Sequence, residues 1–293
     1  RNIGFSWQNP YFTDDGVSRE LEAYNRRTDA SGANLADYDT DEWGGAITFG
    51  IPISEYNAFN FGLRAELTDF QPGGDASDEV IAFGDEFDND FTTVLLTSSF
   101  SVDTRDNRLL PNRGGLTRLT GEIATPLGEL RYFKVSVRHN QFFAIAKNWV
   151  VSLSGDIGYG DGYSDNNNLP LTQNFVAGGP RSVRGFEANT LGPRDSNGAP
   201  LGGSFLIEGN AELILPVPFA DSVKQFRMAA FTDIGNVFGP DEDFDVGELR
   251  SSAGLAALWL SPLGPMKASY AVPLRSKPGD DEQVFQFTFG TAF

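Results

Sequence analysis

The chain has 293 residues, no Cys, one His, and 22 basic against 40 acidic side chains, so its formal net charge is −18. This composition excludes disulfides and thiolate zinc sites and argues against nucleic-acid binding, because phosphate contacts require clustered Lys and Arg. No apolar run approaches the ~20 residues of a membrane-spanning helix, which excludes a helical membrane protein but not a membrane β-barrel with alternating strands.

Alternation of apolar and polar residues recurs along the chain and predicts strands with one apolar and one polar face. Near the C-terminus, for example, Phe285, Phe287 and Phe289 share one face. Gln286 and Thr288 take the other face. The pattern predicts thirteen strands, at 1–12, 17–29, 42–52, 58–70, 90–104, 115–125, 131–144, 148–160, 202–216, 224–237, 249–261, 265–273 and 283–293, with boundaries uncertain by roughly two to four residues. We expect no helix, and no linker divides residues 1–293 into two domains.

The connections between the predicted strands alternate in length. Short turns are expected at 13–16, 54–57, 146–147 and 262–264, and long loops near 30–41, 71–89, 161–201, 238–248 and 274–282. Bacterial outer-membrane barrels have this asymmetry, with short periplasmic turns and long outer loops. A soluble β-sandwich, the alternative fold, distributes its loops less regularly. The sequence therefore predicts an all-β fold, a transmembrane antiparallel β-barrel.

The parity of the strands is unexpected. With all short turns on one side, strands 1–12 and 283–293 run in the same direction, so they cannot close an antiparallel ladder with each other. Either the count is wrong by one, or the chain lacks an odd number of N-terminal strands. Because odd-numbered barrels are rare, we expect a barrel that is incomplete at its N-terminus.

The longest segment without strand character is loop 161–201. Near its centre stand Val183, Arg184, Gly185 and Phe186, in surroundings rich in Gly, Pro and Asn. Long loops in compact chains are usually functional or disordered, and the turn residues here favour an ordered loop. The pattern indicates a fixed hairpin that presents one cation.

Two acids are candidate partners for that cation. Alternation on the two strands after the loop points Glu212 and Asp233 into the lumen. If the loop folds back into the lumen, Arg184 can pair with one or both of them. The alternative is a solvated arginine and ordinary polar lumen residues, and periodicity does not decide between the two.

Several motifs resemble those of BamA-type outer-membrane assembly proteins. Residues 183–186, with Gly178-Gly179 before them and Asn189-Thr190-Leu191-Gly192-Pro193 after them, look like the sixth extracellular loop of that family. Residues 231–235, Phe-Thr-Asp-Ile-Gly, resemble its Phe-x-Asp-x-Gly strand. Related translocation-assembly and two-partner secretion barrels share the Arg-Gly motif, but the continuation at 189–193 is most similar to the BamA type.

The resemblance implies a sixteen-stranded barrel in the bacterial outer membrane, preceded by periplasmic POTRA domains. Those domains and about three initial strands would then be missing from this chain. In the family the loop arginine lies against acids of the neighbouring strands, and the matching positions here are Arg184, Glu212 and Asp233.

The function implied is the folding and insertion of outer-membrane proteins without a chemical reaction. An unfolded client strand would pair with a lateral seam formed by the first and last strands. The last strand carries Phe285, Phe287, Phe289 and the terminal Phe293, although a plain lipid face with an interfacial aromatic explains the same positions. Further implied partners are accessory lipoproteins, bound through the missing POTRA domains, and outer-membrane lipid and lipopolysaccharide.

Two other functions remain open. A passive porin would use the same architecture, and a related translocation or secretion barrel would share the loop motif. An enzyme is not expected, because no nucleophile or acid–base cluster stands out and His139 is the only histidine. The acidic loops 85–90 and 241–248 lack calcium-loop spacing, so neither a metal nor a cofactor is expected.

Overall fold

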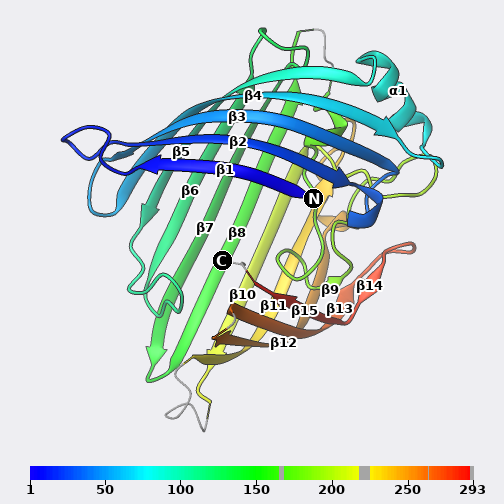
Figure 1. Ribbon diagram of the computed structural model, residues 1–293. Coiled ribbons are helices and arrows are strands. Elements are labelled where there is room, and N and C mark those ends of the chain that lie inside the picture. The colour runs from blue at the N-terminus through cyan, green and yellow to red at the C-terminus, as the bar shows by residue number, and fades with distance from the viewer. Residues whose placement is uncertain (165–167, 218–224, 263, 291–293) are drawn as a thin grey trace.

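A computed structural model describes residues 1–164, 168–217, 225–262 and 264–290 (Figure 1). One antiparallel sheet of thirteen strands runs through the described residues in chain order, which confirms the predicted strands. These strands are β1 (Asn2–Asn9), β2 (Ser18–Asp29), β3 (Tyr38–Pro52), β4 (Asn57–Pro72), β5 (Asp90–Asp103), β6 (Gly114–Ala124), β7 (Tyr132–Ala146), β8 (Trp149–Gly162), β10 (Phe205–Leu215), β11 (Phe226–Phe238), β12 (Arg250–Ser261), β13 (Gly264–Arg275) and β15 (Phe285–Phe289).

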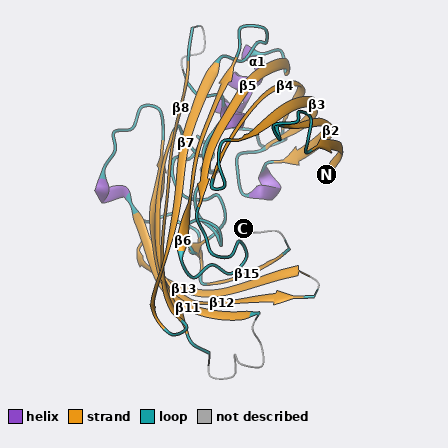
Figure 2. Cartoon of the chain, turned by 90° about the vertical axis from the view of Figure 1, so that its left-hand side faces the viewer, coloured by secondary structure: helices purple, strands orange, loops and turns teal. Residues whose placement is uncertain are grey.

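The two faces of the sheet differ in chemistry, as alternation requires. The sheet is curved, and the long connection between β8 and β10 lies on its concave side (Figure 2). Large apolar side chains stand exposed on the convex face, among them Phe5, Leu21, Leu63, Leu96, Leu119, Leu153, Ile157, Ile234, Leu255 and Phe287. Such a band suits contact with lipid rather than water. We call the concave face the inner wall.

The ladder has two free edges within the described residues. β1 pairs only with β2, and β15 pairs only with β13. Since every neighbouring pair is antiparallel, the first and thirteenth strands run in the same direction. The two edges therefore do not pair with each other, as the parity of the sequence pattern indicated.

Short structured segments interrupt the connections, and the expectation of no helix was wrong. α1 (Asp78–Glu86) lies in the loop after β4, where Ser77 Oγ accepts a hydrogen bond from the Val80 amide at 3.4 Å. Asp78 and Glu79 occupy its first turn, where the helix dipole favours negative charge. Three single-turn helices are η1 (Ser31–Ala33), η2 (Leu171–Gln173) and η3 (Val246–Glu248). Among the described residues, no helix is both long and apolar enough to cross a membrane.

Two buried clusters hold the long loops against the sheet. In the first, α1 contributes Val80 and Phe83, which pack with Phe70 of β4 and Phe91 of β5. The second consists of Val183 and Phe186 with other buried side chains of the connection and the wall, namely Ala177, Leu191, Leu206 and Val237. The loops at this end are thus packed structures, and the second cluster fixes the segment that carries Arg184.

Candidate functional site

A tight turn sets the direction of the Arg184 side chain. The Ser182 amide donates to Gly179 O at 3.2 Å, and the Gly179 amide donates to Val183 O at 3.2 Å. The preceding Gly178 has a φ of +102°, and a Cβ there would lie 2.5 Å from Glu187 O. Glycine is therefore required for the turn to close.

Arg184 binds two carboxylates of the inner wall. Its Nε and Nη2 donate to the two oxygens of Asp233 at 2.7 and 2.8 Å, and its backbone amide donates to the same carboxylate at 3.0 Å. Its Nη1 donates to Glu212 Oε1 at 2.7 Å. The contact with Asp233 is a bidentate, charge-assisted pair, the strong form of such bonds. We call Arg184, Glu212 and Asp233 the clasp.

The Arg184–Asp233 pair of the clasp is buried, and the clasp as a whole joins one cation to two carboxylates. Arg184 is 2% exposed and Asp233 is 1% exposed. Its guanidinium carbon lies 3.3 Å from the ring centroid of Phe231, a cation–π contact. Burial by itself lowers the pKa of Arg184, but the hydrogen bonds to Asp233 and the charges of both acids outweigh it and raise that pKa. The guanidinium therefore stays charged inside the fold.

The partners of Arg184 come from neighbouring inward positions of two paired strands. In the register of β10 and β11, Glu212 stands opposite Phe231 and Asn210 stands opposite Asp233. Asn210 also donates a hydrogen bond to the Asp233 carboxylate. Sequence reasoning placed the two acids on the inward face but did not assign Phe231 and Asn210 to the arginine. The signal was their position across the ladder from the two acids.

The rest of the motif joins the loop to the segment before the last strand. β9 (Gly185–Phe186) and β14 (Glu282–Gln283) form a small two-stranded antiparallel sheet with two residues in each strand. Gln286 of β15 donates its Nε2 to Phe186 O at 2.6 Å. Gly185 has a φ of +92°, and a Cβ at this position would lie 3.3 Å from Ala271 Cβ of β13. The loop thus contacts both the clasp strands and the last strand.

A family model decides the relationship of this chain to known proteins. The model of the Omp85 superfamily domain matches residues 1–293. The chain belongs to the Omp85 superfamily.

Curated relatives of this Omp85 chain are longer than the chain itself. The outer membrane protein assembly factor BamA of Neisseria meningitidis serogroup B is 36% identical over 332 aligned positions, which cover 100% of this chain and 41% of that protein. The protein of the same name from Nitratidesulfovibrio vulgaris is 26% identical, with 98% of this chain and 36% of that protein covered. The chain therefore spans less than half the length of these relatives.

Solved structures agree with the Omp85 fold. The crystal structure of BamA from Haemophilus ducreyi lacking POTRA domains 1–3 has a TM-score of 0.88 at 24% identity, covering 98% of this chain and 61% of that chain. CdiB from Acinetobacter baumannii has a TM-score of 0.59 at 14% identity, covering 98% and 49%. At these identities the likeness concerns the fold alone, and the BamA fold is the nearer of the two.

The C-terminal aromatics of this Omp85 chain lie apart from the clasp. Phe285, Phe287 and Phe289 are 62%, 54% and 55% exposed, on the convex face. Phe293 lies outside the described residues. Within the residues that the structure describes, no three His, Cys, Asp or Glu side chains form a group that could hold a metal ion. The geometry of the clasp supports fixing a loop, and the exposed aromatics support contact with lipid or with another apolar strand.

Proposed function

We propose that this chain folds and inserts β-barrel proteins into the bacterial outer membrane by templated strand pairing at the edge of β15, with no chemical reaction. Its clients would be unfolded outer-membrane proteins. Relatives that carry the name outer membrane protein assembly factor support this proposal. The band of exposed apolar side chains supports a place in the membrane.

The observation that carries the proposal is the weak attachment of the last strand. Among the described residues, β15 pairs with β13 over five residue pairs, whereas β12 and β13 share eleven. Within the described residues its other edge has no partner. Backbone groups without partners in hydrocarbon cost several kcal/mol each, so such an edge favours an incoming client strand by β-augmentation.

The clasp has a supporting role in this proposal. Residues 1–293 would form one barrel domain in which loop 161–201 folds into the lumen. Arg184 would hold that loop while β9 and β14 keep it in contact with the segment that precedes β15. The remaining proposed partners are accessory lipoproteins, bound through POTRA domains, and outer-membrane lipid and lipopolysaccharide around the barrel.

Site-specific disulfide cross-linking tests the proposal directly, because the chain has no cysteine of its own. The protein with Thr288→Cys is mixed with a client whose C-terminal strand carries a cysteine at successive positions. We expect a cross-link in one preferred register. Thr97→Cys on β5 is the matched control, because Thr97 also faces the inner wall and both edges of β5 are already paired along the ladder. Equal cross-linking at both sites would contradict the proposal.

Conductance separates this function from that of a passive porin. A lumen that the loop fills should pass little current in liposomes, and Arg184→Ala should raise the current by releasing the loop. A large current from the unaltered protein would favour the porin.

A further inference from the structure

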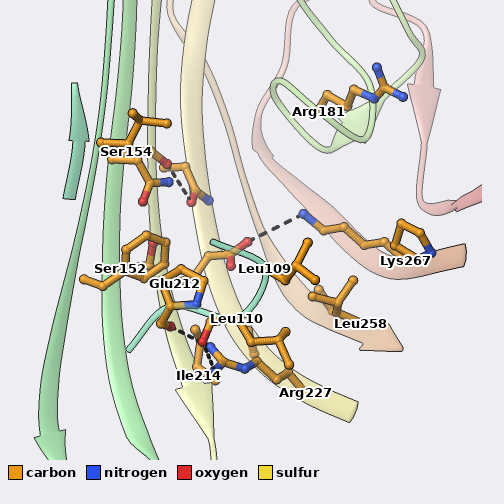
Figure 3. Close-up of a pocket in the computed structure, with 18 of the residues that line it drawn as sticks. Leu109, Leu110, Ser152, Ser154, Arg181, Glu212, Ile214, Arg227, Leu258 and Lys267 are labelled. Atoms are coloured by element: carbon orange, nitrogen blue, oxygen red, sulfur yellow. Dashed lines mark hydrogen bonds and ion pairs between the residues drawn. The ribbon is translucent and has the colours of Figure 1, made fainter. Parts of the chain in front are cut away.

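A cavity of about 800 Å³ lies on the inner wall between two connections. The turn at residues 180–184 borders it on one side, and the connection between β5 and β6, residues 104–113, borders it on the other (Figure 3). The described lining includes eight of the chain's 22 basic residues and two of its 40 acids, Asp156 and Glu212. Three of these bases pair with acids just outside the lining, Arg105 and Arg108 with Asp103 and Arg184 with Asp233, so the other five decide the charge of this surface.

Both acids of the cavity are already engaged. Arg138 donates its Nε to Asp156 Oδ2 at 2.8 Å. Glu212 accepts from Arg184 at 2.7 Å as part of the clasp. Neither acid is therefore left to neutralise the other cations of the lining.

Among the described residues, two further cations of the lining have no carboxylate to themselves. Arg118 of β6 stands directly across the ladder from Arg138 of β7, and like charges in that position destabilise a sheet. Arg118 makes no ion pair or hydrogen bond with any other described residue. Lys267 Nζ lies 3.9 Å from Glu212 Oε1, the oxygen that Arg184 already binds.

A third cation, Arg227 of β11, binds only neutral oxygens. Its Nη2 donates to Leu110 O at 2.7 Å and to Asn112 Oδ1 at 3.0 Å, and its Nη1 donates to Pro111 O at 2.8 Å. No described carboxylate forms an ion pair with it, and Asp106 is the acid whose charge acts on it from outside the lining. Three cations on three strands of one cavity, with only one described carboxylate within 4 Å and that one shared with Arg184, attract an anion to the lining.

The lining is also partly apolar, with Leu109, Leu116, Ile214 and Leu258 between the basic side chains. Ligand sites have volumes of about 300–1,000 Å³ and combine apolar surface with a few placed polar groups. At the rim, Leu109 is 55% exposed and the side chain of Arg108 is 87% exposed. The cavity suits a ligand that carries both carboxylates and apolar groups.

The wall indicates which ligand can reach the cavity. From β6 to β13 the ladder is continuous, so an acyl chain on the convex face is separated from the cavity by hydrogen-bonded strands. An extended polypeptide can enter past the exposed rim instead. We propose that this cavity binds an acidic, partly apolar polypeptide segment, whose carboxylates pair with Arg118, Arg227 and Lys267. The inference goes beyond strand templating and does not depend on it.

The test uses a fluorescent octapeptide that alternates Asp and Leu, titrated into the folded protein in nanodiscs and followed by anisotropy. We expect binding that weakens with salt, because screening reduces charge attraction. The double variant Arg118→Gln, Lys267→Gln should raise the Kd by about 10-fold, equivalent to ~1.4 kcal/mol. Arg118 has no described partner, so its loss removes no contact of the fold. Unchanged heat-dependent gel mobility verifies this.

Controls locate the site and identify the ligand. Lys147→Gln, in the exposed turn between β7 and β8 and outside the lining, should leave the Kd unchanged. A peptide with Asn in place of Asp should not bind. A photo-reactive group on the acidic peptide should label Leu109 or Ile214. The proposal is overturned if the double variant binds as well as the parent, or if the label falls on the convex face. It is also overturned if short-chain phosphatidylglycerol, and not the peptide, binds in an Arg118-dependent way.

Discussion

Two arginines tie connections to the inner wall, and they do so with different acceptors. Arg184 reaches from its loop to the carboxylates of Asp233 and Glu212. Arg227 reaches from β11 to the carbonyl oxygens of Leu110 and Pro111. The first tether joins one cation to two carboxylates, whereas the second has only neutral oxygens as its described acceptors.

The two arginines therefore differ in role. The clasp around Arg184 fixes its loop, whereas Arg227 leaves a positive charge beside the cavity. A buried charge that loses its counterion is strongly destabilising, so a matched pair such as Arg184 and Asp233 holds its geometry. Neutral oxygens satisfy the donors of Arg227 without cancelling its charge. The same wall can therefore fix one connection firmly and still attract an anion near the other.

Arg184→Ala should cause the largest loss of stability among these variants. The substitution leaves Asp233, which is 1% exposed, without its cation. Removing one partner of a buried pair costs about 3–5 kcal/mol. We expect that loss in the free energy of unfolding, measured by urea titration in lipid, together with protease cleavage of loop 163–204.

Two further variants test whether this loss comes from the geometry of the clasp. Arg184→Lys keeps the charge but not the bidentate geometry, so it should recover only part of the loss. Arg113→Ala removes an exposed arginine far from the clasp in sequence and should leave protease protection intact. A loop that remains protected in Arg184→Ala would show that the apolar cluster alone holds it.

Glu212→Gln should have a smaller effect than loss of the arginine. Glu212 has a side chain that is 20% exposed and accepts one bond from Arg184, while Asp233 still provides the bidentate pair. A hydrogen bond to a charged group contributes about 1.5–3 kcal/mol. The same urea titration should place this variant between the parent and Arg184→Ala. Equal losses would mean that Glu212, not Asp233, is the principal partner.

The sequence predicted the two strands that carry the clasp acids better than it predicted the contacts of the clasp. Period-two alternation gives the face of each side chain, which is why Glu212 and Asp233 were expected in the lumen. Alternation does not show how deeply a side chain is buried or which side chains stack on each other. The cation–π contact between Phe231 and Arg184 was therefore missed. α1 was missed because it has nine residues within an acidic loop, where the cap at Ser77 was the main local signal.

Other features depend on residues that are distant in the chain. β9 and β14 have two residues each and are separated by almost a hundred positions, so no local pattern marks them. The cavity was missed for the same reason, because its cations come from four strands and two connections. Only the register of β6 and β7 places Arg118 opposite Arg138.

Arg227→Gln should loosen the second connection with a modest loss of stability. Its three acceptors are neutral oxygens beside the cavity, and each such bond contributes about 0.5–1.5 kcal/mol. We expect faster amide hydrogen exchange at residues 107–112 and unchanged protection of loop 163–204. Simultaneous loosening of both connections would show that the two tethers are coupled rather than independent.

Lys267→Gln should have the smallest effect on stability. The ammonium lies 3.9 Å from Glu212, and its side chain is 34% exposed. A partly exposed pair at this distance contributes about 0–1 kcal/mol, so urea titration should barely separate this variant from the parent. Raising the salt concentration from about 0.1 to 1 M shortens the Debye length from about 10 to about 3 Å. That change should erase any difference between the two proteins while the Arg184 clasp persists. A loss of stability as large as that of Glu212→Gln would instead show that Lys267 contributes to the clasp.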